Sequence, residues 1–384
     1  MHRTRLDAIV VGAGMAGASV AAELSKRLRV VLIERESQPG VHSTGRSAAS
    51  FIPSYKADID ALRILTKVSE FFFREPPVGF TDFPLLKPRG LLTLLREASG
   101  ESSEPSRKRL NDLLGGGIEF LDAHEVTKKL PAISDEWAGG AWWEKNVHDI
   151  DVHGLHHGYF RMLKANGGVV CHDSDAHPQR SGGLWEVCVE QHEYSAPLIV
   201  NAAGAWADEF AERAGVAPVG LQPKRRTAVL VKPPAESTTE DWPLVLAHDE
   251  SFYLKPEAGL LLVSPADEHP TGPCDARPEE LDIAIACDRA CRALKGLNIQ
   301  RVDHAWAGLR TFVGDGLPVI GLDDEAPGFF WCVGQGGHGI QIAPAVAQLS
   351  ASIILDDAVP IKLEELGFHA DWVSPARLRK ESRI

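Results

Sequence analysis

The first 34 residues alternate between apolar runs and glycines, a pattern typical of a nucleotide-binding strand-helix-strand unit. Residues 7–11, DAIVV, are almost wholly apolar and predict a strand buried on both faces. After the GAGMAG turn, small and apolar residues at helical spacing predict a helix through ASVAAELSKRL, residues 18–28. RVVLIERE predicts a second buried strand, which ends at Glu34.

The rest of the chain predicts a second domain with many strands. The proline-rich EPPVGFTDFPLLKPRG, residues 75–90, marks the crossing into it, and the polar REASGESSEPSRKRLNDLLGGG predicts an exposed loop that enters a helix. DIDVHGLHHGYFRMLKANGG has the period of an amphipathic helix capped near Asp151, and VVCHDSDAH predicts a strand that returns to the first unit. From residue 221 to about Asp303 the pattern alternates as in a sheet, around one helix in ELDIAIACDRACRAL.

The GAGMAG turn has the spacing of a dinucleotide-binding fingerprint. Gly12 makes the tight turn, Gly14 lets the backbone approach a pyrophosphate, and Gly17 lets the helix pack close to the strand. The helix N-terminus offers N–H groups and a positive dipole to the phosphates. Glu34 follows Gly12 by 22 residues, close to the offset of a carboxylate that accepts from a ribose hydroxyl. The unit predicts an adenine dinucleotide, FAD or NAD.

Two further segments favour FAD. ERESQPGVHSTGRSAASF, directly after the second strand, is a loop of glycines and small hydroxyl residues whose backbone can pass close to a flat ring. GFFWCVGQGGHGIQIAPAVAQLSASIIL predicts a strand at Phe329–Val333, a glycine-rich turn and a helix, whose N-terminus suits the N1 and C2 carbonyl region of a flavin. The alternative is a strand-helix connection without a ligand.

Composition narrows the class of partner. The chain has 384 residues, 44% apolar and 24% charged, which is enough for two domains. Its net charge of −13 argues against nucleic acid or an anionic membrane as main partner, so an anionic substrate needs a few local cations. No apolar stretch is long enough to span a membrane. The start imitates a signal peptide, but its glycines and Glu23 argue against one, and six scattered cysteines predict reduced thiols in a cytoplasmic protein.

Arg310, in WAGLRTFVGDGLPVIG, stands among small and apolar residues and therefore needs an anionic partner. That partner is either a protein carboxylate such as Asp315 or a ligand. Tyr253, in ESFYLKP, fits a half-buried strand position, and Arg226, in PKRRTAVLV, fits a solvated entry to a strand. For each, a binding role is the alternative.

Two groups of residues invite a metal hypothesis, which we reject. His153, His156 and His157 have helical spacing, but no acid or thiol completes a site, and we expect this part of the helix to face solvent. Cys287 and Cys291, with Cys274 upstream, are equally incomplete. We expect no metal.

Six motifs together resemble the FAD-dependent amine and amino-acid oxidoreductases of the D-amino-acid oxidase and glycine oxidase superfamily. They are VVGAGMAGAS, Glu34-Arg35, HSTGRSAA, IVNAAGAWAD, WAGLRTFVGDGLPVIG and GQGGHGIQ, and they span nearly the whole chain in order. The likeness is greatest to bacterial D-amino-acid dehydrogenases of the D-arginine dehydrogenase type. It implies one FAD without a covalent bond, because Thr311 follows Arg310 where some relatives have a tethering cysteine. His42 is the other candidate for a tether.

The resemblance also implies the fold class, α/β with an α+β substrate part. A discontinuous Rossmann-like FAD-binding domain would comprise residues 1–80, 150–218 and 305–384. A substrate-binding domain on a large antiparallel sheet would comprise residues 81–149 and 219–304.

The resemblance assigns roles to single residues. Arg310 would hold the substrate carboxylate in a bidentate fork, Tyr253 would donate to it, Arg226 would be a second cation, and Tyr55 would line the pocket. His338 would hydrogen-bond as a neutral group rather than act as a base. The other implied pocket residues are Ser50, Ile52, Leu91, Gly308 and Gln341. The implied cofactor residues are Gly12, Ala13, Gly14, Met15, Ala16, Gly17, Glu34, Arg35, Ser43, Thr44, Gly45, Arg46, Ser47, Ala48, Ala49, Asp175, Ala203, Gly204, Gly308, Gly336, Gly337, His338, Gly339, Ile340 and Gln341.

The implied activity is oxidative deamination of a D-amino acid to the 2-oxo acid and ammonia, with hydride transfer from Cα to flavin N5. Ser50 stands where the closest relatives have histidine, and Leu91 stands where a reader of basic side chains has a carboxylate, so we expect apolar or uncharged substrates. Alternatives are glycine, sarcosine-like secondary amines, a 2-hydroxy acid, or a non-catalytic FAD-binding protein. A dehydrogenase is favoured over an oxidase, and the electron acceptor, which is a quinone, a carrier protein or oxygen, stays open.

Overall fold

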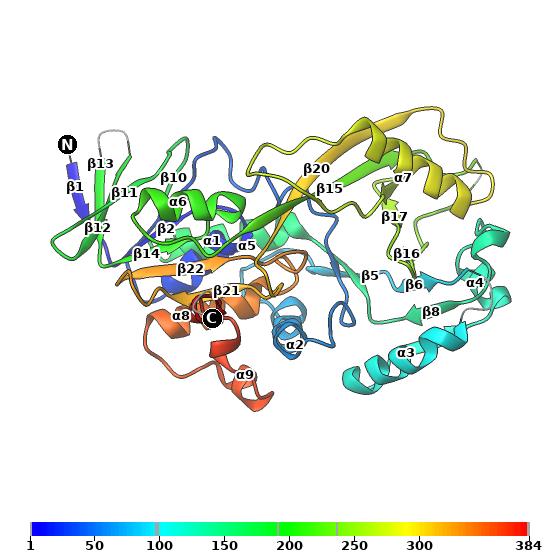
Figure 1. The fold of residues 1–384 in the computed structure, drawn as a ribbon, viewed down its shortest axis with the longest axis horizontal. Coiled ribbons are helices and arrows are strands. Elements are labelled where there is room, and N and C mark those ends of the chain that lie inside the picture. Colours follow the sequence, from blue (N-terminus) through cyan, green and yellow to red (C-terminus); the bar gives the residue numbers. More distant parts are fainter. Residues whose placement is uncertain (1, 97–99, 190–191, 236, 382–384) are drawn as a thin grey trace.

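The computed structural model describes residues 2–96, 100–189, 192–235 and 237–381. Figure 1 shows two bodies side by side, one around β2, β14 and β22 and the other around β15, β17 and α7. Of the polar segment predicted to be a loop and helix, residues 97–99 lie outside the described part, and α3 spans Gly100–Leu114.

A six-stranded sheet forms the centre of the first body. Five of its strands are parallel, and β21 at the edge is antiparallel to β22. Its order is β10 (Val169–Cys171), β3 (Val30–Ile33), β2 (Ala8–Val11), β14 (Leu198–Asn201), β22 (Phe329–Val333) and β21 (Val319–Leu322). All residues of β2, β3 and β22 are buried, which explains their nearly continuous apolar runs. The return of the predicted strand at Val169 to this sheet is confirmed.

Helices cover both faces of this sheet (Figure 1). One face carries α1, α2, α5 and α8 in a common apolar core, and the other carries α6 and a four-stranded sheet around Trp185 and Phe210. The helices are α1 (Met15–Leu24), α2 (Asp60–Arg74), α5 (Val152–Ala165), α6 (Ala207–Arg213) and α8 (Ala343–Ile354). The four strands are, in order, β1 (His2–Arg5), β13 (His192–Ala196), β12 (Leu184–Val189) and β11 (His177–Ser181).

A nine-stranded sheet forms the second body. Its order is β19 (His269–Pro270), β15 (Gln222–Val231), β18 (Leu260–Ser264), β17 (Tyr253–Glu257), β16 (Leu244–Ala247), β6 (Leu91–Leu94), β8 (Ala141–Glu144) and β7 (Ile118–Leu121), with β20 (Val302–Phe312) paired to β15. The expectation of an antiparallel sheet needs one correction, because β6 and β16 are parallel. A long stretch of chain separates these two strands, so they can align in the same direction without a tight turn.

One face of the nine-stranded sheet packs against α7 (Glu280–Ala293), α4 (Ala123–Lys129) and η1 (Asp135–Trp137). The predicted amphipathic helix is therefore confirmed as α7. β15 and β20 pair along almost their whole length, and β20 crosses the domain limit that the resemblance implied between residues 304 and 305. The domain limits stay a prediction.

Short elements complete the chain. Three strands form a small sheet where the chain passes between the bodies, in the order β4 (Ser50–Phe51), β9 (His148–Ile150) and β5 (Leu86–Pro88). The remaining helices are η2 (Gly204–Trp206), α9 (Ile361–Glu365), η3 (Ala370–Trp372) and α10 (Ala376–Glu381). Within the described ranges, every helix is too short or too polar to cross a membrane.

Candidate active site

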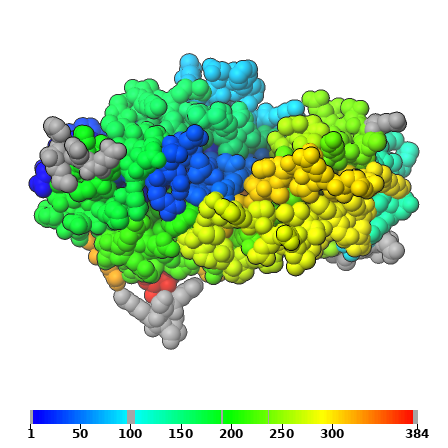
Figure 2. Space-filling model, turned by 90° about the horizontal axis from the view of Figure 1, so that it is seen from above, coloured from blue at the N-terminus to red at the C-terminus, as the bar shows by residue number. Residues whose placement is uncertain are grey.

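A deep cleft joins the two bodies. Its empty volume, counted with the solvent at its open mouth, is about 1620 Å³, and it extends from the turn after β2 to the strands β15, β17 and β20. Figure 2 shows a blue N-terminal segment of the chain lying between the green and yellow parts of the surface. The chain thus brings its first glycine turn and its late strands to one long cavity, which suits an extended cofactor with a substrate at one end.

The glycine turn is packed as the fingerprint predicts. Gly12 has φ +97°, and a Cβ there would lie 2.5 Å from the carbonyl oxygen of Ala202. A Cβ on Gly17 would lie 1.8 Å from the carbonyl oxygen of Gly12. Neither position has room for a side chain, so the backbone of the turn and the start of α1 can face the cleft directly.

Glu34 is held by the backbone at this end of the cleft. Its Oε2 accepts from the Ala13 N–H at 2.6 Å and its Oε1 from the Glu36 N–H at 2.9 Å. A carboxylate has about four acceptor positions, so two remain for a ribose hydroxyl in the cleft that Glu34 lines. The Thr44 hydroxyl accepts from the Met15 N–H at 2.9 Å and caps the start of α1.

His156 corrects our expectation that its part of α5 faces solvent. It is only 5% exposed, and its Nε2 lies 2.9 Å from the carbonyl oxygen of Ala13. Burial lowers the pKa of His156 to about 4, so the ring is neutral and donates to that carbonyl. The sequence held a signal for this, because His156 shares the apolar face of α5 with Tyr159 and Phe160. The expected N-cap at Asp151 is confirmed, with a 2.8 Å bond from the Gly154 N–H.

Two residues that we did not predict, Trp206 and Arg213, line the same end beside predicted ones. The Arg35 guanidinium lies 4.4 Å from the ring centroid of Trp206, and the His42 ring lies 4.6 Å from it. His42 Nε2 is 2.9 Å from a carboxylate oxygen of Glu36. Asp175, a predicted cofactor residue, lines the cleft and pairs with Arg213 at 3.1 Å. Trp206 is the last residue of η2 and Arg213 the last of α6, and sequence spacing carried no signal for either.

Side chains that alternate along β15 and β20 form the opposite end of the cleft. Arg226 and Gly308 pair across β15 and β20, and Arg310 lies two residues further on, so the three share one face of the sheet. Tyr253 on β17 lines the same cleft. Gly308 has no side chain on this face of the sheet, and a Cβ there would lie in contact with Arg46, at 3.4 Å from its Cβ.

Arg310 is the group whose partner the sequence left open. Asp315 is bound to Arg377 at 2.7 and 3.1 Å, which removes the internal ion pair that we considered. Across the described ranges, no hydrogen bond or ion pair is made by the Arg310 guanidinium. A Cβ on Gly337 would lie 3.3 Å from Arg310 Nη1 and 2.8 Å from the Tyr55 hydroxyl, so these two groups converge above the bare glycine.

Arg226 is not a solvated strand entry. Its Nε donates to the carbonyl oxygen of Asp267 at 2.7 Å and its Nη2 to Glu268 at 2.8 Å. Burial, and then the charge of Arg310, lower the pKa of Arg226. The second predicted cation therefore reaches the cleft, but with a carboxylate already bound.

His338 lies behind this group. Its ring stacks on Tyr55 with centroids 4.4 Å apart and an angle of 19°. Burial, and then the charge of Arg310, lower the pKa of His338 to about 4, so it is neutral at physiological pH. Its Nε2 has no hydrogen-bond partner within the described part of the chain.

Most of the predicted residues line the cleft, but ten of them lie outside its lining. Among the pocket residues, Leu91 is 2% exposed and packs in an apolar cluster beside Ile52 and Tyr253. Gln341 is 4% exposed and ties Ile52 to α2 through Thr66, because its two amide ends are satisfied there. The predicted residues outside the lining are Ala13, Gly17, Gly45, Ala49, Ser50, Ile52, Tyr55, Leu91, His338 and Gln341. Those in it are Gly12, Gly14, Met15, Ala16, Glu34, Arg35, Ser43, Thr44, Arg46, Ser47, Ala48, Asp175, Ala203, Gly204, Arg226, Tyr253, Gly308, Arg310, Gly336, Gly337, Gly339 and Ile340.

A buried carboxylate that we had missed lies directly opposite Leu91. Glu144 pairs with Leu91 across β6 and β8, accepts from the Ser54 hydroxyl at 2.7 Å, and has Arg107 at 3.7 Å. Burial raises the pKa of Glu144 despite these two partners. Because Ser54 and Arg107 already hold it, Glu144 is not a free acceptor for a substrate cation.

Comparison with known proteins agrees with this geometry. A family model described as DAO, FAD dependent oxidoreductase, matches residues 7–353. The glycine oxidase of Bacillus licheniformis is 26% identical over 390 residues, which cover 100% of this chain and 99% of that protein. The solved structure of L-proline dehydrogenase from P. horikoshii matches with a TM-score of 0.83 and 20% identity over 99% of both chains. Glycine oxidase from Geobacillus kaustophilus matches with a TM-score of 0.79 and 21% identity, over 96% of this chain and 99% of that one.

These matches confirm the predicted resemblance at the level of the superfamily, the α/β fold class and the choice of FAD over NAD. The finer likeness to D-arginine dehydrogenases stays a prediction. The chain belongs to the DAO family of FAD-dependent oxidoreductases, and its cofactor is FAD.

Proposed function

We propose that this oxidoreductase acts on a small amine or amino acid that carries a carboxylate. The observation that carries the proposal is the unpaired guanidinium of Arg310 at the cleft end opposite the glycine turn, beside the Tyr55 hydroxyl. A guanidinium cannot lose its charge at physiological pH, so an unpaired one in a cleft favours an anionic ligand. The names of the relatives, glycine oxidase and L-proline dehydrogenase, point to amino acids as well.

The residues around Arg310 suit a carboxylate. The planar fork of a guanidinium can donate two parallel hydrogen bonds to the two oxygens of one carboxylate. Tyr253 lines the cleft, and the Tyr55 hydroxyl lies beside Gly337, which lines it too, so both hydroxyls are further donors near Arg310. Fixing the carboxylate in this way would orient the Cα–H toward the cofactor. Such orientation lowers much of the activation barrier of a two-substrate step.

FAD, when bound, supplies the two-electron acceptor for the hydride that leaves Cα. Its phosphates and ribose would lie on the turn of Gly12 and Gly14 and at Glu34, and its ring would lie toward the turn before α8. Thr311, which follows Arg310, offers no thiol for a covalent tether, so we expect the cofactor to be released on denaturation.

Proton transfer needs little from the protein in this scheme. The substrate amine would react in its neutral form, and the positive charge of Arg310 disfavours an ammonium nearby. His338 is neutral and buried. We therefore propose that its ring holds Tyr55 in place by stacking and that it does not act as a general base.

For the substrate we favour a D-amino acid with an apolar or uncharged side chain, oxidised to the 2-oxo acid and ammonia. Leu91 and Ile52 form an apolar cluster packed against Tyr253, which lines the cleft, and Glu144 is occupied by Ser54 and Arg107. A cationic side chain would therefore meet no free carboxylate there.

Glycine or a secondary amine is a second candidate, which the names of the relatives favour. A 2-hydroxy acid would use the same arginine and release no ammonia. A non-catalytic FAD protein would never bleach with any of these compounds.

One experiment separates these candidates. The purified holoprotein is mixed without oxygen with D- and L-amino acids, glycine, sarcosine, proline and 2-hydroxy acids, and flavin bleaching and ammonia are followed. Reduction by D-leucine, D-phenylalanine or D-methionine faster than by D-arginine, with ammonia release, would support the proposal. Faster reduction by D-arginine or D-lysine would contradict the argument from Leu91. Admission of oxygen with a peroxide assay, and then addition of a quinone, identifies the acceptor; we favour a dehydrogenase that reacts slowly with oxygen.

A further inference from the structure

Two guanidinium groups face the substrate end of the cleft, and only one of them has a counter-charge. Arg226 binds Glu268 through Nη2 at 2.8 Å and the Asp267 carbonyl through Nε at 2.7 Å. For Arg310, the described residues supply no such partner. The two guanidinium charges repel each other, since the charge of Arg310 lowers the pKa of Arg226.

Glu268 stays ionised in this position. Its other oxygen accepts from Lys224 at 3.2 Å. Partial burial opposes ionisation, but the bond from Lys224 and the charges of Arg226 and Arg310 outweigh it and hold the pKa of Glu268 below its usual range. The carboxylate of Glu268 is thus a fixed negative charge within the field of both arginines.

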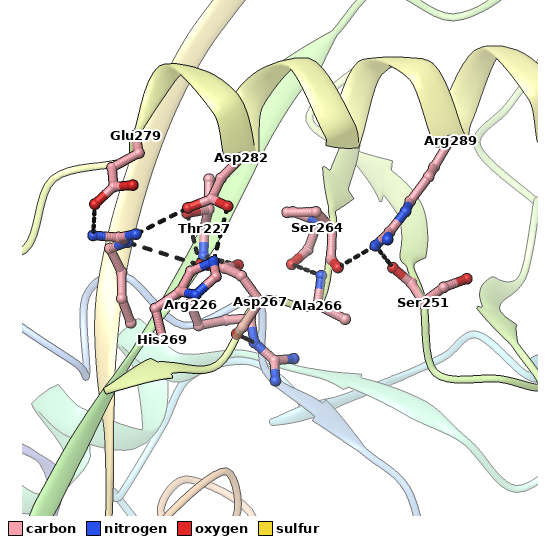
Figure 3. A network of polar contacts seen from close by, with 12 residues as sticks. Arg226, Thr227, Ser251, Ser264, Ala266, Asp267, His269, Glu279, Asp282 and Arg289 are labelled. Carbon is pink, nitrogen blue, oxygen red and sulfur yellow. Dashed lines mark hydrogen bonds and ion pairs between the residues drawn. The ribbon is translucent and has the colours of Figure 1, made fainter. Parts of the chain in front are cut away.

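The segment that carries Glu268 is held from behind by α7. The Asp267 carboxylate accepts from the Thr227 N–H at 2.7 Å and from its hydroxyl at 3.0 Å, as Figure 3 shows. On the α7 side, Asp282 contacts His269 Nε2 through Oδ1 at 3.1 Å and accepts from Arg225 Nη2 through Oδ2 at 3.1 Å.

The same helix also supports the segment before Asp267. Arg289 on α7 donates to the carbonyl oxygen of Pro265 at 2.8 Å and also to that of Ser251, two residues before Tyr253 (Figure 3). Ala266 adopts φ +55°, and its N–H is bound by the Ser264 hydroxyl. Glu268 therefore follows a backbone that is fixed on both sides.

This network also accounts for the one cluster of metal-type ligands found among the described residues, Asp267, His269 and Asp282. Arg225 lies 3.1 Å from Asp282 and 3.9 Å from Asp267, and Thr227 occupies both oxygens of Asp267. The arginine supplies the cation, so the cluster is a support for the β15 strand and not a candidate metal site.

We propose that Glu268 determines substrate charge in this site. It neutralises Arg226 and leaves Arg310 as the guanidinium that accepts a substrate carboxylate, so the site takes monocarboxylates and discriminates against dicarboxylates. Arg226 lines the cleft and lies 2.8 Å from Glu268, so a second substrate carboxylate that approached Arg226 would be repelled by the charge of Glu268. This inference rests on the proposed function, in which Arg310 binds the substrate carboxylate.

The test uses Glu268→Gln in the FAD-loaded protein. Glutamine keeps an oxygen that accepts from Arg226, so the geometry is preserved while the charge is lost. The ratio of kcat/KM for D-glutamate to that for D-glutamine, which differ in one charge at equal shape, should rise about tenfold or more. Glu279→Gln is the matched control, because Glu279 belongs to the same network but pairs with Arg225 at 2.5 Å, and its ratio should not change.

An unchanged ratio in Glu268→Gln, or an equal rise in Glu279→Gln, would overturn the inference. So would a wild type that oxidises D-glutamate as readily as D-glutamine. Flavin content and melting temperature of both variants establish that they are folded.

Calorimetric titration of the holoprotein with valerate and glutarate separates this inference from the proposed function. These acids have five carbons and carry one and two charges. Wild type should bind valerate more tightly, and Glu268→Gln should shift the preference toward glutarate. If that shift occurs but no amine or amino acid is oxidised, the charge selection stands and the proposed function fails. If neither acid binds the wild type, both fail.

Discussion

Replacing Arg310 by methionine should strongly lower turnover without cost to stability, because Arg310 binds nothing that the structure describes in the protein itself. Methionine keeps much of the length and apolar volume of the side chain and removes its charge and donors. Loss of a two-pronged, charge-assisted contact with a carboxylate costs about 3–6 kcal/mol, at about 1.5–3 kcal/mol for each of the two bonds. Because Tyr55 and Tyr253 remain as donors, we expect the lower end, which corresponds to a roughly 10²-fold decrease in kcat/KM.

The stability of the same variant provides the internal check. Removal of an arginine that has hydrogen-bond partners in the protein would lower the free energy of unfolding by about 1–3 kcal/mol and the melting temperature by several degrees. For Arg310→Met we expect a change of less than about 1 °C, and FAD content equal to that of the wild type.

The assay is anaerobic stopped-flow reduction of the flavin with the best substrate of the panel, for wild type, Arg310→Met and the control Arg74→Met. Arg74 pairs with Glu70 on the surface of α2, so its loss should leave reduction unchanged. A yellow Arg310→Met protein that is reduced within about threefold of the wild-type rate would refute the assignment of Arg310. A large fall in melting temperature would refute its description as unpaired.

Three other predictions concern the two ends of the cleft. In Gly17→Ala, a Cβ 1.8 Å from the Gly12 carbonyl oxygen should displace the turn, and the purified protein should have a much lower ratio of flavin to protein absorbance. Gly337→Ala should raise KM and keep its FAD, because its Cβ would lie 2.8 Å from the Tyr55 hydroxyl; an unchanged KM would contradict the convergence of Tyr55 and Arg310. His156 has a pKa of about 4 in the folded protein and about 6.5 when unfolded, so the unfolded chain takes up the proton first. Its contribution is fully present above about pH 6.5, and up to about 3 kcal/mol is lost as pH falls toward 4. Urea unfolding at pH 7 and pH 5 should show a smaller pH effect for His156→Gln than for the wild type.

Local sequence was sufficient for the elements whose partners are close along the chain. The strand, turn and helix around Gly12 and the second strand that ends at Glu34 form as predicted, because apolar runs and glycine spacing define such a unit within about 30 residues. The helix α7 and the cap at Asp151 are local in the same sense. Alternation along β15 and β20 would also have indicated that Arg226 and Arg310 share a face, had the register been known.

Contacts between distant segments could not be obtained in this way. The parallel pairing of β6 with β16 joins residues about 150 positions apart in the sequence, and no local pattern specifies the direction of such a pair. The burial of His156 against Ala13 and the bond between Arg226 and Glu268 depend likewise on how α5 and the β18–β19 segment fold back. Leu91 was expected to touch the substrate, but Ile52 and Tyr253 stand around it in the folded chain.

By itself the sequence determined the cofactor class, since the glycine spacing, the carboxylate at Glu34 and the six ordered motifs constrain chemistry that backbone and side chains carry locally. Only the tertiary structure decided which charges are paired. Asp315 pairs with Arg377, Glu144 binds Ser54 and Glu268 pairs with Arg226, whereas Arg310 has no partner among the residues that the structure describes. The physical reason is that a salt bridge requires atoms within a few ångström, and the packing of sheets and helices from remote segments sets those distances.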